Sequence, residues 1–225
     1  MMGPFGHGVS PSGGSAIKKY DCIEKGMAME ITAAMVKELR EQSGAGIMEC
    51  KNALKETEGN IEEAIVALRK KGMAKADKKG DREAGDGTIG SYIHAGGKIG
   101  VLLKLHCETD FVANTPDFQE LNKDIAMHIA AAKPRFVSRD EVTEAILGQE
   151  REIFAHQARE SGKPENIIDK IVTGKMEKFY EENCLLEQPF IKDTDKTIQE
   201  LIKEKIAKLG ENITVGQFAR MEISR

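Results

Sequence analysis

The stretch GTIGSYIHAGGKIGVLLKLHCETDFV, residues 87–112, decides the fold predicted for this chain. It contains two runs rich in β-branched and other apolar residues, Thr88 to His94 and Ile99 to Cys107, which predict two strands. Residues 95–98 between them read Ala-Gly-Gly-Lys and are suited to a hairpin turn. The stretch therefore predicts an antiparallel pair of strands.

The chain after this hairpin continues the mixture of strand and helix patterns. Apolar residues at helical spacing predict helices, and short apolar runs predict further strands. The helices are expected at 116–132, 139–160, 164–183 and about 196–209, and the strands near Pro189–Ile191 and Ile213–Ile223. Residues 87–225 are therefore predicted to form an α+β core domain, an antiparallel sheet packed with helices.

Residues 29–72 predict a small N-terminal module of three short helices. Thr32 and Asn60 are suited to cap the first and third helices, because their side-chain oxygens can accept from the free N–H groups of a first turn. The first helix is expected to end at the glycine turn 44–46, and the third at Gly72 in a left-handed conformation. A unit of this size has a marginal core unless it docks on another part of the molecule.

Two polar segments flank this module. Residues 73–86 lack a long apolar stripe and are interpreted as a linker. Residues 1–28 are rich in Gly, Ser and Pro and lack the apolar core of a signal peptide. We interpret them as a disordered leader or tag and leave them out of the fold prediction.

The composition favours a protein partner over nucleic acid or membrane. Lys and Arg number 33 against 37 for Asp and Glu, so the formal charge of −4 differs from the basic balance of a nucleic-acid binder. The chain has no Trp and three Tyr, which leaves few aromatic rings for stacking on bases. It also lacks an apolar run of about 18 residues, so no membrane span is expected.

The cysteines indicate a reducing environment. Cys22, Cys50, Cys107 and Cys184 are far apart and form no CxxC pair, which argues against a zinc ribbon or a thioredoxin-type site. A chain long enough to build its own core needs no disulfide framework. We therefore expect free thiols and a cytoplasmic protein.

The motifs that suggest an enzyme are incomplete. Residues 85–90 match GxGxxG, but they follow a polar segment and open a strand, whereas a dinucleotide fingerprint opens a helix. His106, Glu108 and Asp110 alternate and would share one strand face, yet no second ligand cluster completes a metal site. Cys107 and His106 point to opposite faces and cannot act as nucleophile and base. No cofactor or metal site is therefore expected.

The sequence Thr-Asp-Phe-Val at residues 109–112 lies between the second strand and the helix beginning at Pro116. An aromatic residue at a loop tip is suited to insertion into a partner's pocket. The pattern by itself favours the other interpretation, in which Phe111 folds back into the core. Both interpretations stay open at this point.

Several motifs together resemble the elongation factor Ts family. KELREQSGAGIMECKNAL and EGNIEEAIVALRKKG resemble its N-terminal module, a three-helix bundle of the ubiquitin-associated type. SYIHAGGKIGVLLKLHCETDFVAN, DIAMHIAAAKPRFVSRDEV, ESGKPENIIDKIVTGKMEKFYEENCLLEQPF and IAKLGENITVGQFARMEI resemble successive parts of its core. The resemblance covers residues 29–225, with the motifs in the family's order.

The resemblance implies a non-catalytic guanine-nucleotide exchange factor for elongation factor Tu. The factor would bind the GDP-bound and nucleotide-free forms of that partner and insert the loop that carries Asp110 and Phe111. Thr109, Asp110, Phe111 and Val112 would displace the partner's Mg2+ and so release GDP. The family implies no cofactor of the factor's own and no direct contact with nucleic acid.

Further partner contacts follow from the motifs. Met48 and Lys51 lie in GIMECK, His94 in SYIHAG, and Leu209 and Gly210 in KLGENI. Two alternatives stay open, because His94 could be an ordinary exposed strand histidine and Gly210 an ordinary helix stop.

The chain resembles the short form of the family. A single copy of the strand–hairpin motif runs from Ser91 to Val112, whereas longer members have two. The resemblance implies that the inserted coiled-coil hairpin is lacking, and that the chain forms a homodimer and a two-plus-two complex with elongation factor Tu. Cys184 would lie near the subunit interface.

A second function is compatible with part of the sequence. The three-helix module alone also resembles ubiquitin-binding and nascent-chain-binding modules, so the chain could be an adaptor without exchange activity. That interpretation accounts for residues 31–71 and for nothing after residue 87.

Overall fold

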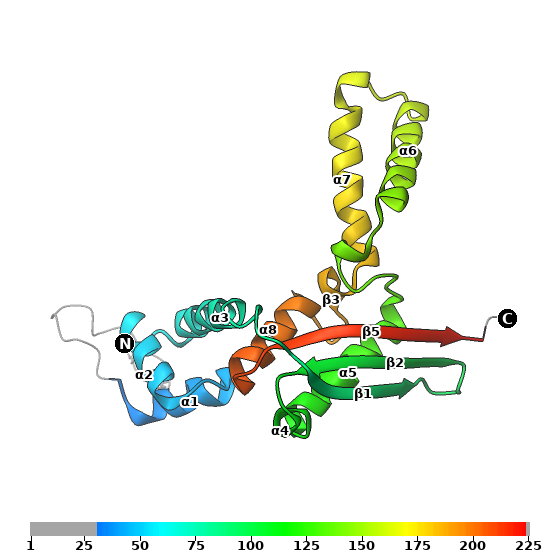
Figure 1. Cartoon of the computed structure of the whole chain (residues 1–225). Coiled ribbons are helices and arrows are strands. Elements are labelled where there is room, and N and C mark those ends of the chain that lie inside the picture. Colours follow the sequence, from blue (N-terminus) through cyan, green and yellow to red (C-terminus); the bar gives the residue numbers. More distant parts are fainter. Residues whose placement is uncertain (1–30, 224–225) are drawn as a thin grey trace, which may run out of the picture.

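A computed structural model describes residues 31–223, so the predicted leader 1–28 lies outside the described residues. In this range the chain forms a helical bundle, a sheet domain and a projecting two-helix arm (Figure 1). The helices are α1 Ala33–Ser43, α2 Ile47–Glu56, α3 Ile61–Asp77, α4 Asp110–Ala113, α5 Pro116–Ala132, α6 Glu144–Glu160, α7 Glu165–Asn183 and α8 Ile198–Leu209. The strands are β1 Asp86–Ile93, β2 Ile99–Cys107, β3 Pro189–Phe190, β4 Asp193–Thr197 and β5 Ile213–Glu222, and two short 3-10 turns span Arg139–Glu141 and Leu185–Glu187.

The N-terminal bundle consists of α1, α2 and the first part of α3. The predicted caps are confirmed, since the Thr32 side chain accepts from Met35 N and the Asn60 side chain from Glu63 N. Gly44 ends α1 with a positive φ of 66°, which a glycine adopts without strain. The bundle encloses a small core made of Leu39, Cys50, Ala53, Leu54 and Ala64.

The prediction that α3 ends at Gly72 is wrong, because the helix continues to Asp77. Residues 73–77 of the predicted linker are therefore helical, and Ala76 is buried in the core of the sheet domain. A Cβ atom on Gly72 would lie 3.3 Å from the Cβ of Ala207 on α8. The glycine thus allows α3 and α8 to approach closely, and this tertiary contact extends the helix past a residue that would otherwise favour ending it.

The sheet has the order β1-β2-β5, and both strand pairs are antiparallel. The predicted hairpin is confirmed, with Tyr92 opposite Val101. Helix α5 lies along one face of the sheet (Figure 1). The core is formed by alternate residues of β2 and the inner faces of α5 and α8, namely Val101, Leu103, Leu105, Cys107, Phe118, Leu121, Ile125, Ile129, Ile202 and Ile206. The predicted α+β fold with an antiparallel sheet is therefore observed.

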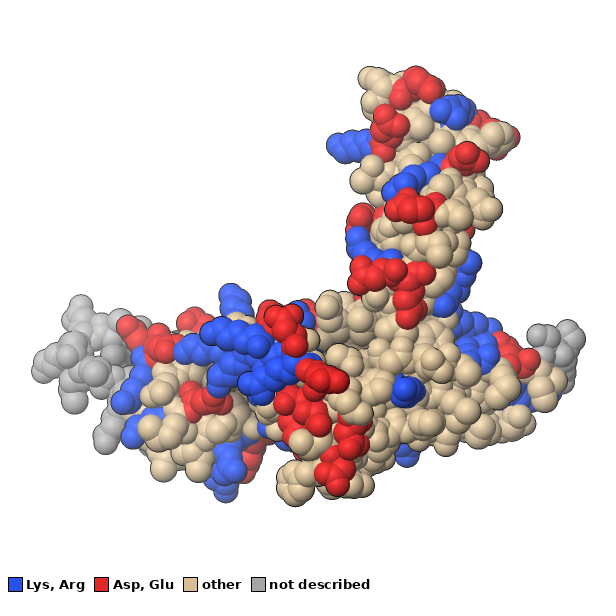
Figure 2. All heavy atoms as spheres, in the orientation of Figure 1, with Lys and Arg blue, Asp and Glu red and all other residues tan. Residues whose placement is uncertain are grey.

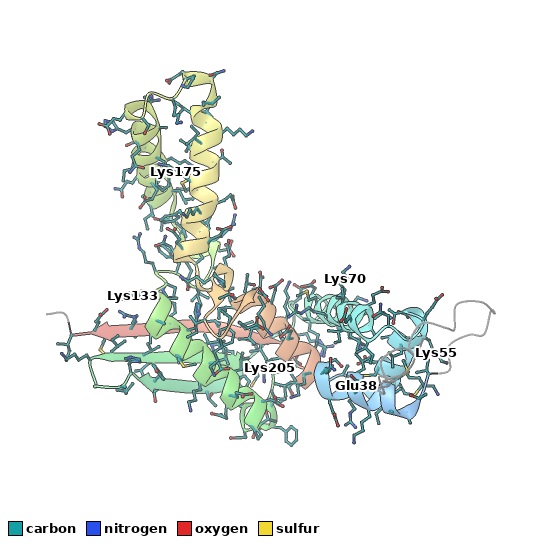
Figure 3. The ribbon with its side chains drawn as sticks, turned by 180° about the vertical axis from the view of Figure 1, so that it is seen from behind. Glu38, Lys55, Lys70, Lys133, Lys175 and Lys205 are labelled. Carbon is teal, nitrogen blue, oxygen red and sulfur yellow. The ribbon has the colours of Figure 1, made fainter. Side chains whose placement is uncertain are left out.

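Helices α5 and α8 are also joined by charged groups at their solvent edge. Lys205 reaches from α8 toward α5, where its Nζ lies 3.0 Å from Asp117 Oδ1 and 3.2 Å from Glu120 Oε2 (Figure 3). Lys208 Nζ lies 2.7 Å from the same Asp117 oxygen. These bonds from Lys208 and Lys205 lower the pKa of Asp117 below its ordinary value.

Helices α6 and α7 form an arm that projects from the sheet domain (Figure 1). The helices predicted at 139–160 and 164–183 correspond to this pair, although α6 begins only at Glu144, and the turn 161–164 reverses the chain with Gly162 at a φ of 68°. So short a turn forces the two helices to lie antiparallel. Lys175 on α7 donates to Gln157 Oε1 on α6 at 2.7 Å, and its ammonium lies over the Phe154 ring (Figure 3).

The base of the arm is held by the Arg139 side chain and by buried residues around Cys184. Arg139 lies 2.7 Å from a Glu177 oxygen and 2.5 Å from a Glu187 oxygen, and its guanidinium stacks over Tyr180. Cys184 is fully buried beside them, and burial raises the pKa of its thiol to about 11.

Within residues 31–223, none of the helices combines the length and the apolar character needed to cross a membrane. Cys50, Cys107 and Cys184 are free and buried, and Cys22 lies outside the described residues.

Candidate functional site

Helix α4 is a single helical turn at the end of β2, and it contains most of the Thr-Asp-Phe-Val motif. Val112 and Ala113 are buried in the core of the sheet domain, whereas Phe111 is 79% exposed. Successive residues of a helix point about 100° apart, so one turn can bury two neighbours and expose the residue before them. The structure therefore places Phe111 outward, against the interpretation in which it folds into the core.

The backbone of α4 is held by hydrogen bonds at both ends. Thr109 is the N-cap residue, and its Oγ1 accepts from Val112 N at 3.4 Å. At the other end, Asn114 Nδ2 donates to Asp110 O at 2.8 Å and Thr115 Oγ1 donates to Val112 O at 2.8 Å. Asp110 and Phe111 are thus exposed side chains on a backbone that is fixed on both sides.

A carboxylate from a distant segment also holds Thr109. Glu211 lies in the turn between α8 and β5, and its two oxygens accept from Thr109 N at 3.0 Å and Thr109 Oγ1 at 2.7 Å. The Cys107 thiol donates to Thr109 O at 3.1 Å. Burial, aided by the negative charge of Glu211, raises the pKa of Cys107, so this thiol stays protonated and can donate.

Gly210 makes the turn that presents Glu211. Its φ of 85° ends α8 in the left-handed conformation, which a glycine adopts without strain. Leu209 packs partly against the core of the sheet domain. Glu211 and Asn212, which follow, were not predicted as site residues. In the sequence, only their position directly after the predicted contact residues Leu209 and Gly210 could have indicated them. Thr109 and Glu108, which they bind, lie about a hundred positions earlier in the chain.

Asn212 connects the same turn to the segment after α3. Its side-chain nitrogen donates to Gly80 O at 3.1 Å and to Arg82 O at 2.7 Å. Its backbone N–H donates to Glu108 Oε1 at 2.6 Å, and Arg82 pairs with Glu108 at 3.6 Å. The turn 210–212 therefore contacts both the approach to α4 and the end of the bundle's last helix.

The other predicted partner-binding residues lie elsewhere on the surface. Met48 on α2 is 66% exposed, Lys51 one turn further along is also exposed, and Ile47 beside them is exposed as well. His94 follows the end of β1, and its Nδ1 lies 3.1 Å from Tyr92 Oη.

These groups are spread along one elongated body. Figure 1 shows α2 in the bundle, α4 at the end of the sheet nearer to the bundle, and the β1–β2 turn at the far end of the sheet. The structure thus brings Gly210 close to the Thr109–Val112 turn but places Met48 and His94 apart from it. Figure 2 shows acidic side chains around the position of α4 and basic ones over α3.

The motifs that suggested an enzyme have structural explanations. The GxGxxG match runs into β1 and opens a strand, as predicted. A Cβ atom on Gly90 would lie 2.0 Å from Asn122 Oδ1, so that glycine allows α5 to pack on the sheet. His106 Nδ1 lies 3.2 Å from Asp86 O, and Glu108 Oε1 accepts a hydrogen bond from Asn212 N. Within the described residues, no group of three or more His, Cys, Asp or Glu is placed to hold a metal ion.

Comparison with known proteins assigns this chain to a family. A family model described as Elongation factor TS matches residues 19–225. The chain is 59% identical over 193 residues to the elongation factor Ts of Syntrophomonas wolfei, covering 86% of this chain and 90% of that protein. It is 58% identical over 195 residues to that of Fervidobacterium nodosum, covering 87% and 99%, and 58% identical over 192 residues to that of Geobacter sulfurreducens, covering 85% and 89%.

Proposed function

The chain belongs to the elongation factor Ts family, and on that premise we propose that it binds elongation factor Tu and promotes the release of its GDP. The observation that carries the proposal is the exposure of Phe111 on a turn whose next two residues are buried. An aromatic ring held in water on a fixed backbone is suited to enter a pocket of a partner. The residue needs little rearrangement on binding, since hydrogen bonds already fix its backbone.

The insertion provides a physical means of weakening the partner's hold on GDP. Burying a Phe side chain contributes on the order of 2–3 kcal/mol, which can offset a distortion of the partner beside its nucleotide. Asp110 brings a carboxylate to the same place, and a carboxylate is a preferred ligand of Mg2+. Displacement of that ion removes the charge that neutralises the phosphates of GDP. Thr109 and Val112 contribute by fixing the turn.

The effect on the nucleotide is reciprocal. If the factor weakens GDP binding by some ratio, GDP weakens the binding of the factor by the same ratio. The factor therefore forms its tightest complex with the nucleotide-free partner, and arrival of a new nucleotide releases it. No covalent bond is made or broken, so the factor acts without catalytic groups.

The remaining contacts fix how the factor lies on its partner. We propose that Met48 and Lys51 of the bundle, His94 of the hairpin and the Leu209–Gly210 turn all contact elongation factor Tu. Three separate attachment regions on one body define a single orientation, which delivers Phe111 to one place. Leu209 offers only part of its side chain, because it also packs against the core.

We further propose that two copies of the chain pair. The face of the sheet opposite α5 carries the exposed apolar side chains Ile89, Leu102 and Met221, and no other described element covers it. Stacking two such faces would remove this apolar surface from water. A two-plus-two complex with elongation factor Tu then follows from symmetry. A monomer by light scattering at tens of micromolar would contradict the pairing.

The exchange proposal is tested by stopped-flow release of fluorescent GDP from elongation factor Tu. The wild-type chain should accelerate release, and Phe111→Ala should lose most of the acceleration, by roughly tenfold or more. Ile153→Ala is a matched control, since Ile153 is another exposed apolar residue but lies on the arm.

The same experiment distinguishes the exchange function from the alternative in which the chain is an adaptor. An adaptor that works through the bundle would be indifferent to Phe111→Ala. Absence of acceleration by the folded wild-type chain, with a competent partner, would refute the exchange function and favour the adaptor.

A further inference from the structure

We propose that Glu211 is a positioning residue for the exposed turn α4, which it holds through Thr109. The inference rests on the proposed exchange function, in which Phe111 of α4 acts on elongation factor Tu. Glu211 would not touch the partner's nucleotide; its role would be to keep Phe111 and Asp110 in the orientation in which they enter.

The first argument is that α4 is too short to be stable by itself. A single helical turn fixes several backbone torsions for very few hydrogen bonds, so its conformation must be imposed by its surroundings. Val112 and Ala113 anchor the second half of the turn in the core. The first half, which carries Asp110 and Phe111, has no such apolar anchor and depends on Thr109 and its partners.

The second argument concerns the direction of the hydrogen bonds. Both donors of Thr109, the backbone N–H and the hydroxyl, are taken by the two oxygens of one carboxylate. Because the Thr109 hydroxyl donates its proton to Glu211, the lone pairs of Thr109 Oγ1 point away from Glu211 and can accept a hydrogen bond. Val112 N donates to this oxygen at 3.4 Å. Glu211 thereby orients the cap of α4, and bonds to a charged acceptor are stronger than bonds to a neutral one.

The third argument is that the turn carrying Glu211 is itself immobilised. Gly210 fixes the end of α8, and Asn212 is buried with its side-chain nitrogen bonded to two carbonyl oxygens of the segment after α3. Ile213 enters the core directly afterwards. A carboxylate on so constrained a turn acts as a fixed clamp, whereas an exposed surface glutamate would not.

The test is the dependence of GDP release on factor concentration for three variants. Glu211→Ala should lower the maximal release rate at saturating factor by roughly tenfold, since two charge-assisted bonds are lost. The concentration for half-maximal rate should change little, because the bundle and hairpin contacts remain. Glu211→Gln should retain most of the rate, since an amide oxygen still accepts from Thr109 N. Glu160→Ala, which removes an exposed glutamate of the arm, should leave the rate unchanged.

A double-mutant cycle with Phe111→Ala distinguishes positioning from general stability. If Glu211 acts through the turn, adding Glu211→Ala to Phe111→Ala should lower the rate much less than Glu211→Ala does in the wild-type background, since only the placement of Asp110 is then lost. An equal loss in both backgrounds, or a wild-type rate in Glu211→Ala, would overturn the inference while leaving the exchange function intact.

Hydrogen exchange of residues 110–113 in the free chain supplies a readout that needs no partner. Faster exchange in Glu211→Ala than in wild type supports the clamp, and unchanged exchange overturns it. If the wild-type chain fails to accelerate GDP release, the proposed function fails, and this measurement still decides whether Glu211 holds the turn.

Discussion

The bundle and the sheet domain of this chain bury very different amounts of apolar surface. The bundle has a core of five small or medium side chains around Leu54. The sheet domain encloses a much larger cluster that joins the sheet to α5 and α8 and includes Phe118. The turn that carries the exposed Phe111 is anchored on the large core, whereas the helix that carries the exposed Met48 is anchored on the small one. We therefore expect the turn at Phe111 to be rigid and the bundle to be the less stable of the two regions.

Helix α3 joins the two regions. Its first half contributes Ala64 to the bundle core, and its second half places Ala76 in the sheet-domain core. Gly72 lies between them, where α3 passes close to Ala207 of α8. The bundle is thus joined to the sheet domain by packing along one helix, together with the ion pairs Arg69–Glu204 and Asp77–Lys203 between α3 and α8. The following predictions test this comparison.

The largest effect is expected for Leu54→Ala, which truncates one of the two fully buried leucines of the small core. Leu-to-Ala changes at buried sites cost about 2–5 kcal/mol, which is comparable to the whole stability of a unit of this size. Hydrogen exchange should rise throughout α1 and α2 and stay unchanged in β2. The exposed Val66 of α3 provides the control, and Val66→Ala should leave both regions unchanged.

If Leu54→Ala reduced protection from hydrogen exchange equally in β2 and in α2, the distinction between a weak bundle and a stable sheet domain would be contradicted. Such a result would mean that the two regions unfold as one cooperative unit, with α3 transmitting the destabilisation.

An intermediate effect is expected from acid on the sheet domain. His128 on α5 is fully buried, its Nε2 lies 2.9 Å from Gln188 Oε1, and its Nδ1 has no partner within the described residues. Burial lowers the pKa of this histidine below 6.5, so the unfolded chain takes up a proton more readily than the folded one. The stability of the folded chain with a neutral His128 is therefore fully present above pH 6.5. The free energy of unfolding then decreases as the pH falls below that value.

The expected slope from this one group is up to about 1.4 kcal/mol per pH unit below pH 6.5. Urea unfolding followed by circular dichroism at pH 7 and 5.5 measures it, and His128→Gln should flatten the dependence. The carboxylates with lowered pKa, such as Asp117, lose their contribution only in more acidic solution. A slope that persists in His128→Gln would assign the acid sensitivity to another group.

The smallest effect is expected for Arg69→Ala at the contact between α3 and α8. Arg69 lies 3.1 Å from Glu204, but the Arg69 side chain is 44% exposed and that of Glu204 30%, and ion pairs near the surface contribute about 0–1 kcal/mol. Urea unfolding should shift by less than about 0.5 kcal/mol. A loss several times larger would show that ion pairs, and not the packing at Gly72, hold the bundle in place.

Local signals in the sequence predicted much of the fold. The bounds of α5 and β2 are those predicted, because a capped apolar stripe and an apolar run between turns are patterns of consecutive residues. Thr32 and Asn60 act as predicted for the same reason. Strand β4 was missed because Asp193–Thr197 has no apolar pattern and pairs only with the two residues of β3.

The sequence by itself also determined the family and the position of the Thr109–Val112 motif, since both depend on which residues follow one another. Only the tertiary structure decided that Phe111 points into solvent, because that depends on Val112 and Ala113 taking the places in the core. The same holds for Gly72, whose role is set by Ala207, and for Glu211, which meets Thr109 from far along the chain. Contacts between distant segments leave no periodic trace in a sequence, because they arise only when packing brings those segments together.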